Sequence, residues 1–434
     1  MKHTGIFVSV LATALLLSCG GKGKTGGAVE IEFWYGLGGK LGETMESMIA
    51  RFNESQEEVR VTGVQQSSYT ETERQLQAAA AAGQVPAAAL LNTATMNNFS
   101  LRGITEPLDS YAAAYPDFNR DDIVPSFLSY CVNDRNELTA LPAFGTTQIM
   151  YYRIDAFRDA GIDPDEAFRS WQTLAAAAAK MTRRSGGEVV FYGWEPMWGQ
   201  SNMVDIAAAN GARVVSDDGR KALLDRPEWI EAWESMRRWL HEDRIMGIHH
   251  GGDGWEYWYK TIDDVMQGRA AGYTGSSGDQ GDLDFSVVAA HIQPGYGNRP
   301  PLPYAEPLVM ILLKGADSAQ KEAGFKWMKF FSSPEITAQY SMKTGYIPVR
   351  SSCVDIPEYR AYTTANPQAL VPLKQAEIAR KLFIDFTGGK INTALDDAND
   401  LVQIENVPAA RALGEAQKIA QAALDEYWAE RDRN

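Results

Sequence analysis

Two short segments of the chain gather aromatic side chains next to carboxylates. Residues 192–198 read Tyr-Gly-Trp-Glu-Pro-Met-Trp, and residues 255–259 read Trp-Glu-Tyr-Trp-Tyr. Indole and phenol rings stack on the C–H faces of sugar rings, while acidic side chains bind sugar hydroxyls. Neither segment has the period of a helix or a strand. We therefore expect Trp194, Trp198 and Trp255 to face a ligand; the alternative, that these rings pack a core, stays open.

The sequence patterns of common enzyme classes are missing. The chain has no Gly-x-Ser-x-Gly elbow, no Gly-x-x-x-x-Gly-Lys-Ser/Thr loop and no His-Glu-x-x-His helix. Gly36, Gly38 and Gly39 follow an expected strand, but the third glycine of a dinucleotide fingerprint is not at its offset. We expect a protein that is not an enzyme and needs no cofactor.

The histidines and paired carboxylates point to no metal or catalytic site. His249 and His250 are neighbours, so their side chains point to different sides, and a solvated loop is favoured over a metal site. The pairs at 263–264 and 396–397 lie on expected helix surfaces, whereas a glycosidase needs two carboxylates facing each other across a cleft. A surface glycosidase and a structural or adhesive protein remain as alternatives from other functional classes.

The elements that must position these residues alternate between strand and helix. We expect strands at 29–35, 59–64, 87–92 and 141–152, and helices at 41–53, 69–82, 155–160, 171–181, 229–240, 319–331 and 409–428. This alternation predicts an α/β fold with a mostly parallel sheet, which binds ligands at the carboxyl ends of its strands. In the 229–240 helix, Trp229, Trp233 and Trp239 share one face and are expected in the core.

The N-terminus predicts export and a lipid anchor. The apolar run 5–17 is shorter than the roughly 20 residues of a spanning helix. The segment Leu16-Leu17-Ser18-Cys19-Gly20 resembles the bacterial lipoprotein cleavage box, which implies a diacylglyceryl group on Cys19. We expect a signal peptide at 1–18, the lipidated cysteine and a flexible tether at 19–28, and a protein held at the cell membrane, facing the periplasm or the exterior. A plain signal peptide is the alternative.

The net charge indicates which classes of partner are unfavourable, and the cysteine count indicates whether disulfides can hold the fold together. The chain has 41 Lys and Arg against 56 Asp and Glu, a net charge of −15, which disfavours nucleic acid and anionic lipid as partners. Apart from Cys19, the cysteines are Cys131 and Cys353, too few for a disulfide framework, and whether they pair stays open. The length suits two lobes.

From Ile31 onward the chain resembles the family 1 solute-binding proteins of ABC importers, and most closely their glycerol-3-phosphate-binding members. Five stretches carry the resemblance in order: 33–53 with its Gly-Gly-Lys, 83–96 with Gly-x-x-Pro, 141–174 with Leu-Pro and Tyr-Tyr, 266–278 with Met-x-Gly-Arg-Ala-Ala and Ser-Ser-Gly, and 343–349, Lys-Thr-Gly-Tyr-Ile-Pro-Val.

The resemblance implies a two-lobed periplasmic-binding-protein fold of class II type. The chain would cross a hinge near Gln148, Tyr304 and Ser352, with residues 29–147 and 305–352 in the first lobe and 148–304 and 353–434 in the second. A small-molecule ligand would bind in the cleft between the lobes, which close around it. The loaded monomer would deliver it to the integral-membrane permease of an ABC importer.

The resemblance also suggests ligand residues. Tyr69 and Tyr346 match site tyrosines of the glycerol-3-phosphate binders, but Glu306 replaces a glycine and would repel a phosphate dianion. The arginine expected for phosphate is not evident, and Lys390 is the nearest cation. We expect a sugar or oligosaccharide as ligand, with glycerol-3-phosphate or a glycerophosphodiester as the alternative. The predicted ligand-binding residues are Trp34, Tyr35, Tyr69, Thr93, Thr146, Thr147, Trp194, Trp198, Trp255, Ser276, Ser277, Glu306, Tyr346 and Lys390.

Overall fold

The structure is a computed structural model that describes residues 27–133, 135–252, 256–381 and 383–433. The predicted signal peptide, Cys19 and Trp255 lie outside these ranges. In the described part of the chain, no helix combines the length and the apolar character needed to span a bilayer.

One mixed sheet runs through the whole molecule. Its strands are β1 (Val29–Tyr35), β2 (Val59–Gln65), β3 (Ala88–Leu91), β4 (Leu141–Arg153), β7 (Glu195–Pro196), β8 (Gly272–Ser276), β9 (Val288–His291) and β10 (Ala305–Leu312). They lie in the order β2-β1-β3-β10-β4-β8-β7, with β9 also paired to β4. A separate hairpin is formed by β5 (Arg183–Ser185) and β6 (Glu188–Phe191).

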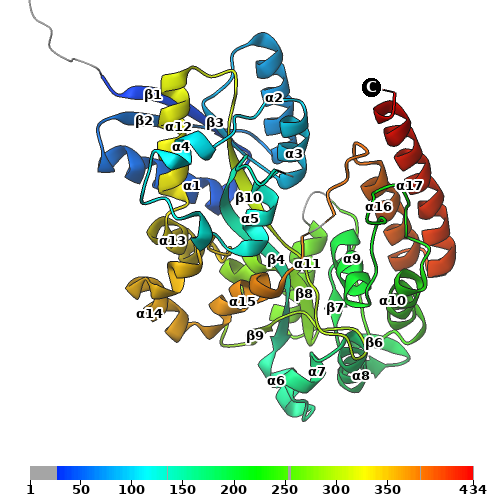
Figure 1. Cartoon of the computed structure of the whole chain (residues 1–434). Coiled ribbons are helices and arrows are strands. Elements are labelled where there is room, and N and C mark those ends of the chain that lie inside the picture. The colour runs from blue at the N-terminus through cyan, green and yellow to red at the C-terminus, as the bar shows by residue number, and fades with distance from the viewer. Residues whose placement is uncertain (1–26, 134, 253–255, 382, 434) are drawn as a thin grey trace, which may run out of the picture.

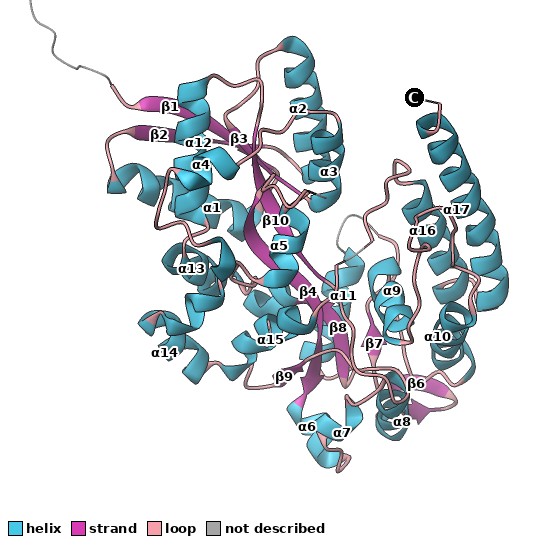
Figure 2. Cartoon of the chain, in the orientation of Figure 1, coloured by secondary structure: helices cyan, strands magenta, loops and turns pink. Residues whose placement is uncertain are grey.

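Helices flank this sheet along its length (Figure 2). Those packed on the first part of the sheet are α1 (Gly39–Ser55), α2 (Tyr69–Ala82), α3 (Thr93–Leu101), α4 (Asp109–Ala113), η1 (Arg120–Asp122), α5 (Pro125–Cys131), α12 (Ser318–Phe331), α13 (Pro334–Thr344) and η4 (Ser351–Asp355). The second part carries α6 (Ile154–Asp159), α7 (Pro164–Ala167), α8 (Trp171–Met181), α9 (Gln200–Ala209), α10 (Pro227–Arg237), η2 (Arg238–Glu242), α11 (Glu256–Met266), η3 (Ser277–Asp282), α16 (Lys390–Gln403) and α17 (Ala409–Arg431). Near the junction lie α14 (Pro357–Ala365), η5 (Pro367–Leu370) and α15 (Val371–Ile378).

The chain forms two lobes. Figure 1 shows one lobe around β1, β2 and β3 and a second around α8, α9, α10, α16 and α17, with β4 running between them. Each lobe has its own large buried cluster: one contains Phe33, Leu90 and Trp327, and the other contains Trp171, Trp233 and Leu413. The predicted two-lobed α/β fold is confirmed.

The sheet is less parallel than the alternation of elements predicts. β1 pairs in parallel with β2 and β3, and β7 with β8, but β10 runs antiparallel to β3 and β4, and β4 antiparallel to β8 and β9. The reason is that β4 enters the second lobe while β10 returns from it. These two crossing strands must therefore run in opposite directions.

The hinge is visible in the pairing of β4. Thr147 pairs with Ala305 of β10, whereas the next residue, Gln148, pairs with Ser276 of β8. The strand thus changes its partner, and its lobe, within one peptide unit. Tyr304, directly before β10, forms an isolated bridge with Arg380.

The segment that follows Ser352 still contacts the first lobe. Cys353 and Tyr359 share a buried cluster with Ala338 of α13, and Leu373 of α15 packs with Phe127 of α5. These contacts tie α14 and α15 to the first lobe. We propose that the third crossing lies near Arg380 and not near Ser352.

Most predicted helices and strands form close to their predicted ranges. The helices at 69–82 and 171–181 have the predicted bounds, and each begins at a serine that accepts a hydrogen bond from a backbone N–H, Ser68 from Glu71 and Ser170 from Thr173. Trp229, Trp233 and Trp239 are buried, as predicted. Cys131 and Cys353 are both buried, free thiols.

Candidate functional site

Six predicted ligand residues lie together where the lobes meet, and we call them the hinge cluster. They are Tyr69, Thr93, Thr146, Ser276, Glu306 and Tyr346. Tyr69 and Thr93 begin α2 and α3, directly beyond the carboxyl ends of β2 and β3, as expected for a ligand site in an α/β lobe. Their role in binding remains a prediction.

Hydrogen bonds connect the hinge cluster across the crossing strands. The Thr93 hydroxyl donates to Oε2 of Glu306 over 3.1 Å. Thr146 and Glu306 are opposite each other in the β4–β10 pair, so their side chains share one face of the sheet. The hydroxyl oxygens of Thr146 and Ser276 lie 3.3 Å apart, and this contact joins a first-lobe pair to the end of β8.

The tyrosines of the hinge cluster are close to charged groups. Burial is the main cause that raises the pKa of Tyr69, and the neighbouring Tyr346 and Glu306 raise it further. Burial, followed by the charge of Asp279, raises the pKa of Tyr346 to about 12. The Tyr346 ring also lies so close to Gly278 that a Cβ there would be 2.8 Å from Cζ of the ring. Glycine at this position lets η3 approach the first lobe.

Two carboxyl groups at the junction have a raised pKa. Burial raises the pKa of Glu306, although the hydrogen bond from Thr93 lowers it in part. Burial also raises the pKa of Asp279 to about 7, against the lowering effect of hydrogen bonds from the Trp258 indole at 3.0 Å and the Tyr273 hydroxyl at 3.1 Å. Such groups can exchange hydrogen bonds with hydroxyls but disfavour additional negative charge.

The two aromatic segments meet in the second lobe. The ring centroids of Trp198 and Tyr257 are 4.8 Å apart in an edge-on arrangement, and Trp258 follows Tyr257 on α11. The half-buried Trp198 donates its indole N–H to Oδ1 of Asp400 over 2.8 Å. Tyr259, 58% exposed, is near enough to Tyr346 to influence its pKa. We call Trp198, Tyr257, Trp258 and Tyr259 the aromatic row; its member Tyr259 lies near Tyr346 of the hinge cluster.

A cation lies at the crossing itself. Arg380 pairs with the buried Asp205 over 3.3 Å, and Gln293 donates to the other oxygen of Asp205 over 2.8 Å. Burial raises the pKa of Asp205 to about 7, while Arg380 lowers it. The sequence reasoning named Lys390 as the nearest cation and overlooked Arg380, whose position depends on the path of α15.

Trp194 is a core residue, which corrects the prediction that it faces a ligand. Its side chain is 0% exposed and donates its indole N–H to the Thr274 hydroxyl over 3.1 Å. A Cβ on Gly272 would lie 2.4 Å from the indole, so this glycine in β8 makes room for the ring. The ring is therefore enclosed by its own lobe.

Three other predicted residues are also buried for structural reasons. Tyr35 is fully buried and donates its hydroxyl to the Glu46 carboxylate. The Thr147 hydroxyl donates to the carbonyl of Tyr304 over 2.6 Å, and the Ser277 hydroxyl accepts from the Thr147 amide over 3.4 Å. These partners hold the hinge together and correct the prediction that the three side chains meet a ligand.

Trp34 and Lys390 lie away from the hinge cluster. Trp34 lines a groove of about 810 Å³ between α2 and the start of α12, at the end of the sheet where β3 begins and β10 ends. Lys390 forms an ion pair with Glu426 of α17. The prediction that these two residues join the other ligand residues is corrected.

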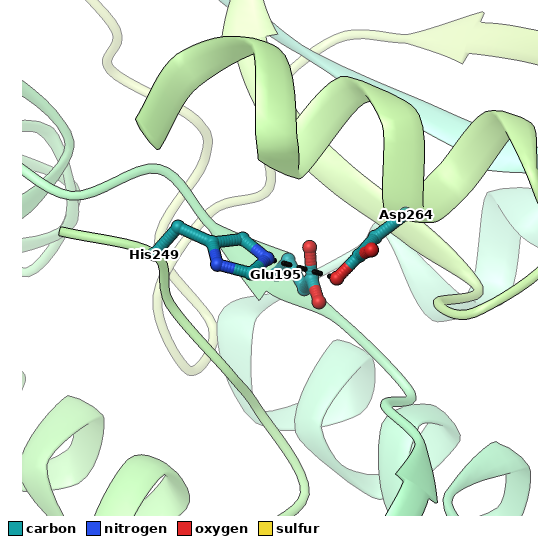
Figure 3. Close-up of side chains that lie close together, drawn as sticks. All are labelled: Glu195, His249 and Asp264. Carbon is teal, nitrogen blue, oxygen red and sulfur yellow. Dashed lines mark hydrogen bonds and ion pairs between the residues drawn. The ribbon is translucent and has the colours of Figure 1, made fainter. Parts of the chain in front are cut away.

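The structure also brings together three residues that sequence reasoning separated. Nε2 of His249 donates a hydrogen bond to Oδ2 of Asp264 over 2.8 Å, and Glu195 lies beside both residues (Figure 3). The loop of His249 is thus not simply solvated, which corrects the sequence interpretation. Burial, and then the charge of Asp264, raises the pKa of Glu195 well above its usual range. No signal in the sequence spacing connects these residues.

Comparison with known proteins agrees with this architecture. Residues 47–367 match a protein family described as bacterial extracellular solute-binding protein. The chain is 25% identical over 414 residues to the sn-glycerol-3-phosphate-binding periplasmic protein UgpB of Yersinia pestis, with 91% of this chain and 90% of that protein covered.

Two solved structures share the fold at lower identity. The sugar-binding protein MalE from Xanthomonas citri superposes with a TM-score of 0.80 at 18% identity, covering 94% of this chain and 100% of that one. UgpB from Mycobacterium tuberculosis, in complex with glycerophosphocholine, has a TM-score of 0.78 at 21% identity, covering 92% of this chain and 100% of that one.

Proposed function

The chain belongs to the family of bacterial extracellular solute-binding proteins, and on this premise we propose that it captures a sugar or oligosaccharide between its lobes for an ABC importer. The observation that carries the choice of ligand is the Glu306 carboxyl in the middle of the hinge cluster. It lies among the hydroxyls of Thr93, Thr146 and Tyr69 and has a raised pKa. A sugar hydroxyl can hydrogen-bond to this group in either protonation state, whereas the ionised carboxylate would repel a phosphate dianion.

The aromatic row supports the same ligand class. Tyr259, the most exposed ring of the row, lies near enough to Tyr346 of the first lobe to raise its pKa, and Trp198 packs edge-on against Tyr257 of the same row. Stacking on Trp198 from one lobe and hydrogen bonds to Glu306 from the other would give a sugar contacts with both lobes. A ligand that contacts both lobes favours the closed arrangement, which is the signal that a permease reads.

Glycerol-3-phosphate or a glycerophosphodiester is the second candidate. Its support is the name of the Yersinia pestis relative, together with the sequence resemblance, which implies that Tyr69 and Tyr346 correspond to site tyrosines of such binders. Lys40, at the start of α1, would serve a phosphate: a Cβ on Gly281 would lie 3.6 Å from its Nζ. Among the described residues Lys40 has no ion-pair partner within 4.0 Å.

A thermal-shift screen separates the two candidates. We expect maltose or maltotriose, and not glycerol-3-phosphate or glycerophosphocholine, to raise the unfolding temperature, because a ligand at 100 times its Kd stabilises by about 2.7 kcal/mol. The affinity for the sugar should change little between low and high salt, because no ion pair forms between the sugar and the protein. Stabilisation by the glycerophosphate compounds alone, weakening with salt, would establish the second candidate.

The remaining parts of the proposal concern location and assembly. We propose that the chain is a lipid-anchored monomer, held to the membrane by Cys19 alone, and that it has no catalytic activity. The support is the lipoprotein-like box at 16–20 and the absence of enzyme motifs from the sequence. Turnover of a chromogenic glycoside by the purified chain would contradict the last point.

A further inference from the structure

Glu195, His249 and Asp264 form a cluster that the proposed function does not use. They come from β7, from the loop after η2 and from α11, and one ligand atom of each lies within 4.8 Å of the others. Figure 3 shows the three side chains directed toward one another, with the helix that carries Asp264 on one side and the loop of His249 on the other. Imidazole nitrogen and carboxylate oxygen are ligands of divalent transition metals.

Glu195 provides a second, independent observation: its carboxyl group is buried and one of its oxygens has no hydrogen-bond partner within the described ranges. Glu195 is 2% exposed, and within the described ranges its Oε2 has no hydrogen-bond partner. A buried carboxyl oxygen without a hydrogen-bond partner is energetically unfavourable, whether or not the group is charged. An oxygen of this kind, directed at an imidazole and a second carboxylate, is what a bound cation would satisfy.

The residues around the cluster leave one oxygen of Asp264 directed at His249 and Glu195. Oδ2 of Asp264 accepts a hydrogen bond from Nε2 of His249 over 2.8 Å. Oδ1 of Asp264 accepts a hydrogen bond from Nε of Arg269 over 2.5 Å. Arg269 also pairs with Asp263. Arg269 therefore orients Asp264 through Oδ1, and Oδ2 remains on the side of His249 and Glu195.

We propose that Glu195, His249 and Asp264 bind a divalent cation of the zinc class. Ligand atoms around a tetrahedral zinc ion stand about 3.4 Å apart. The 2.8 Å between Nε2 of His249 and Oδ2 of Asp264 would therefore open by about 0.6 Å, and the widest separation in the cluster, at most 4.8 Å, would close by up to about 1.4 Å. Three protein ligands leave the fourth position for water or a further ligand. The presence of an imidazole favours zinc over magnesium and calcium, which prefer oxygen ligands alone.

A cation at this site would hold together the segments next to the aromatic row. Trp198 follows Glu195 by three residues, and Tyr257 precedes Asp264 by seven on the same helix. A cation held by these ligands would connect the His249 loop with β7 and α11, and the aromatic row lies on α11 and just after β7. The proposal does not depend on the identity of the transported solute.

Zinc binding to the full chain, purified without an affinity tag and stripped with EDTA, tests the proposal. We expect one zinc per chain after titration and desalting, measured by elemental analysis, and a higher unfolding temperature with zinc but not with magnesium or calcium. X-ray absorption at the zinc edge should show nitrogen and oxygen ligands without sulfur.

Matched variants assign the ligands. His249→Ala should weaken zinc binding at least tenfold, whereas His250→Ala, which removes the exposed neighbouring imidazole, should leave it unchanged. Glu195→Gln should also weaken it at least tenfold, with circular dichroism confirming that the variant is folded. Failure of the parent chain to retain zinc would overturn the proposal. Equal losses in the two histidine variants would overturn it too, because they would indicate chelation by a surface histidine pair.

Discussion

Thr93 and Glu306 are 213 residues apart in the chain, and a hydrogen bond of 3.1 Å joins the hydroxyl of one to the carboxylate of the other. The bond connects the start of α3 to the start of β10, and Glu306 lies two residues after Tyr304, which forms the bridge with Arg380. A ligand that contacts Glu306 would therefore act on a strand that links the lobes. This is the place where binding energy can most directly bias the hinge.

Replacing Glu306 should change affinity according to ligand class. If the ligand is a neutral sugar, Glu306→Ala removes a hydrogen-bond partner at the centre of the site and should cost about 1–3 kcal/mol of binding free energy. Glu306→Gln should cost less, since an amide can still bond hydroxyls. Calorimetric titration with the best ligand from the thermal-shift screen measures both, with Glu430→Ala on the exposed side of α17 as the control. Tighter binding by Glu306→Gln would instead indicate an anionic ligand.

Replacing Trp198 should mainly weaken ligand binding, whereas replacing Trp194, four positions earlier, should mainly weaken the fold. Trp198→Ala should cost about 1–3 kcal/mol of binding free energy with modest loss of stability, because its ring is half-buried at the aromatic row. Trp194→Ala should lower the free energy of unfolding by about 3–5 kcal/mol, because it empties a closed core site.

Chemical denaturation and calorimetry on both variants separate stability from affinity. Lys390→Met serves as the control and should alter neither quantity strongly, since Lys390 is paired with Glu426 away from the hinge cluster. Loss of binding in Lys390→Met with full binding in Trp198→Ala would reverse our assignment of the site.

Asp279 should make the protein less stable as pH rises toward neutrality. Its pKa is raised to about 7, so the buried neutral form stabilises the fold fully below the usual pKa of an aspartate, and this stabilisation is lost as pH rises through about 7. Asp279→Asn stays neutral. Relative to the parent, its free energy of unfolding should therefore increase between about pH 4 and pH 8, by up to roughly 4 kcal/mol. Urea denaturation across this range measures the difference, and parallel curves for the two proteins would refute the assignment.

Ligand should compact the chain by hinge closure. The lobes are connected by β4, by β10 and, as we propose, by the segment near Arg380, so they can rotate while each keeps its own core. We expect a smaller radius of gyration in small-angle scattering at saturating ligand, with unchanged helix content by circular dichroism. An unchanged radius at saturation confirmed by calorimetry would argue against a clamp.

Cys19→Ser should release the protein from the membrane. The thioether-linked lipid is the strong tether that the sequence offers, so the variant should move to the aqueous phase in detergent partitioning and lose metabolic labelling with a fatty acid. Unaltered partitioning of the variant would mean that another segment holds the chain.

The local sequence by itself determined the elements and the class of fold. The helix at 69–82 has the predicted bounds because Ser68 caps its start and Gly83, at φ +69°, ends it, both through contacts within a few residues. The helix at 171–181 also has the predicted bounds, because Ser170 caps its start. Resemblance to a family then brought Tyr69, Glu306 and Tyr346 to one site, a grouping that periodicity alone does not contain.

Only the tertiary structure decided which of several similar side chains reach that site. Trp194 is enclosed and Trp198 is half-exposed because Gly272, far along the chain, leaves space for one ring and not because the two residues differ in their local sequence. Likewise, Glu195, His249 and Asp264 meet only once β7, a loop and α11 are packed together. Burial and contact between distant segments are properties of the packed chain, and a local pattern carries no record of them.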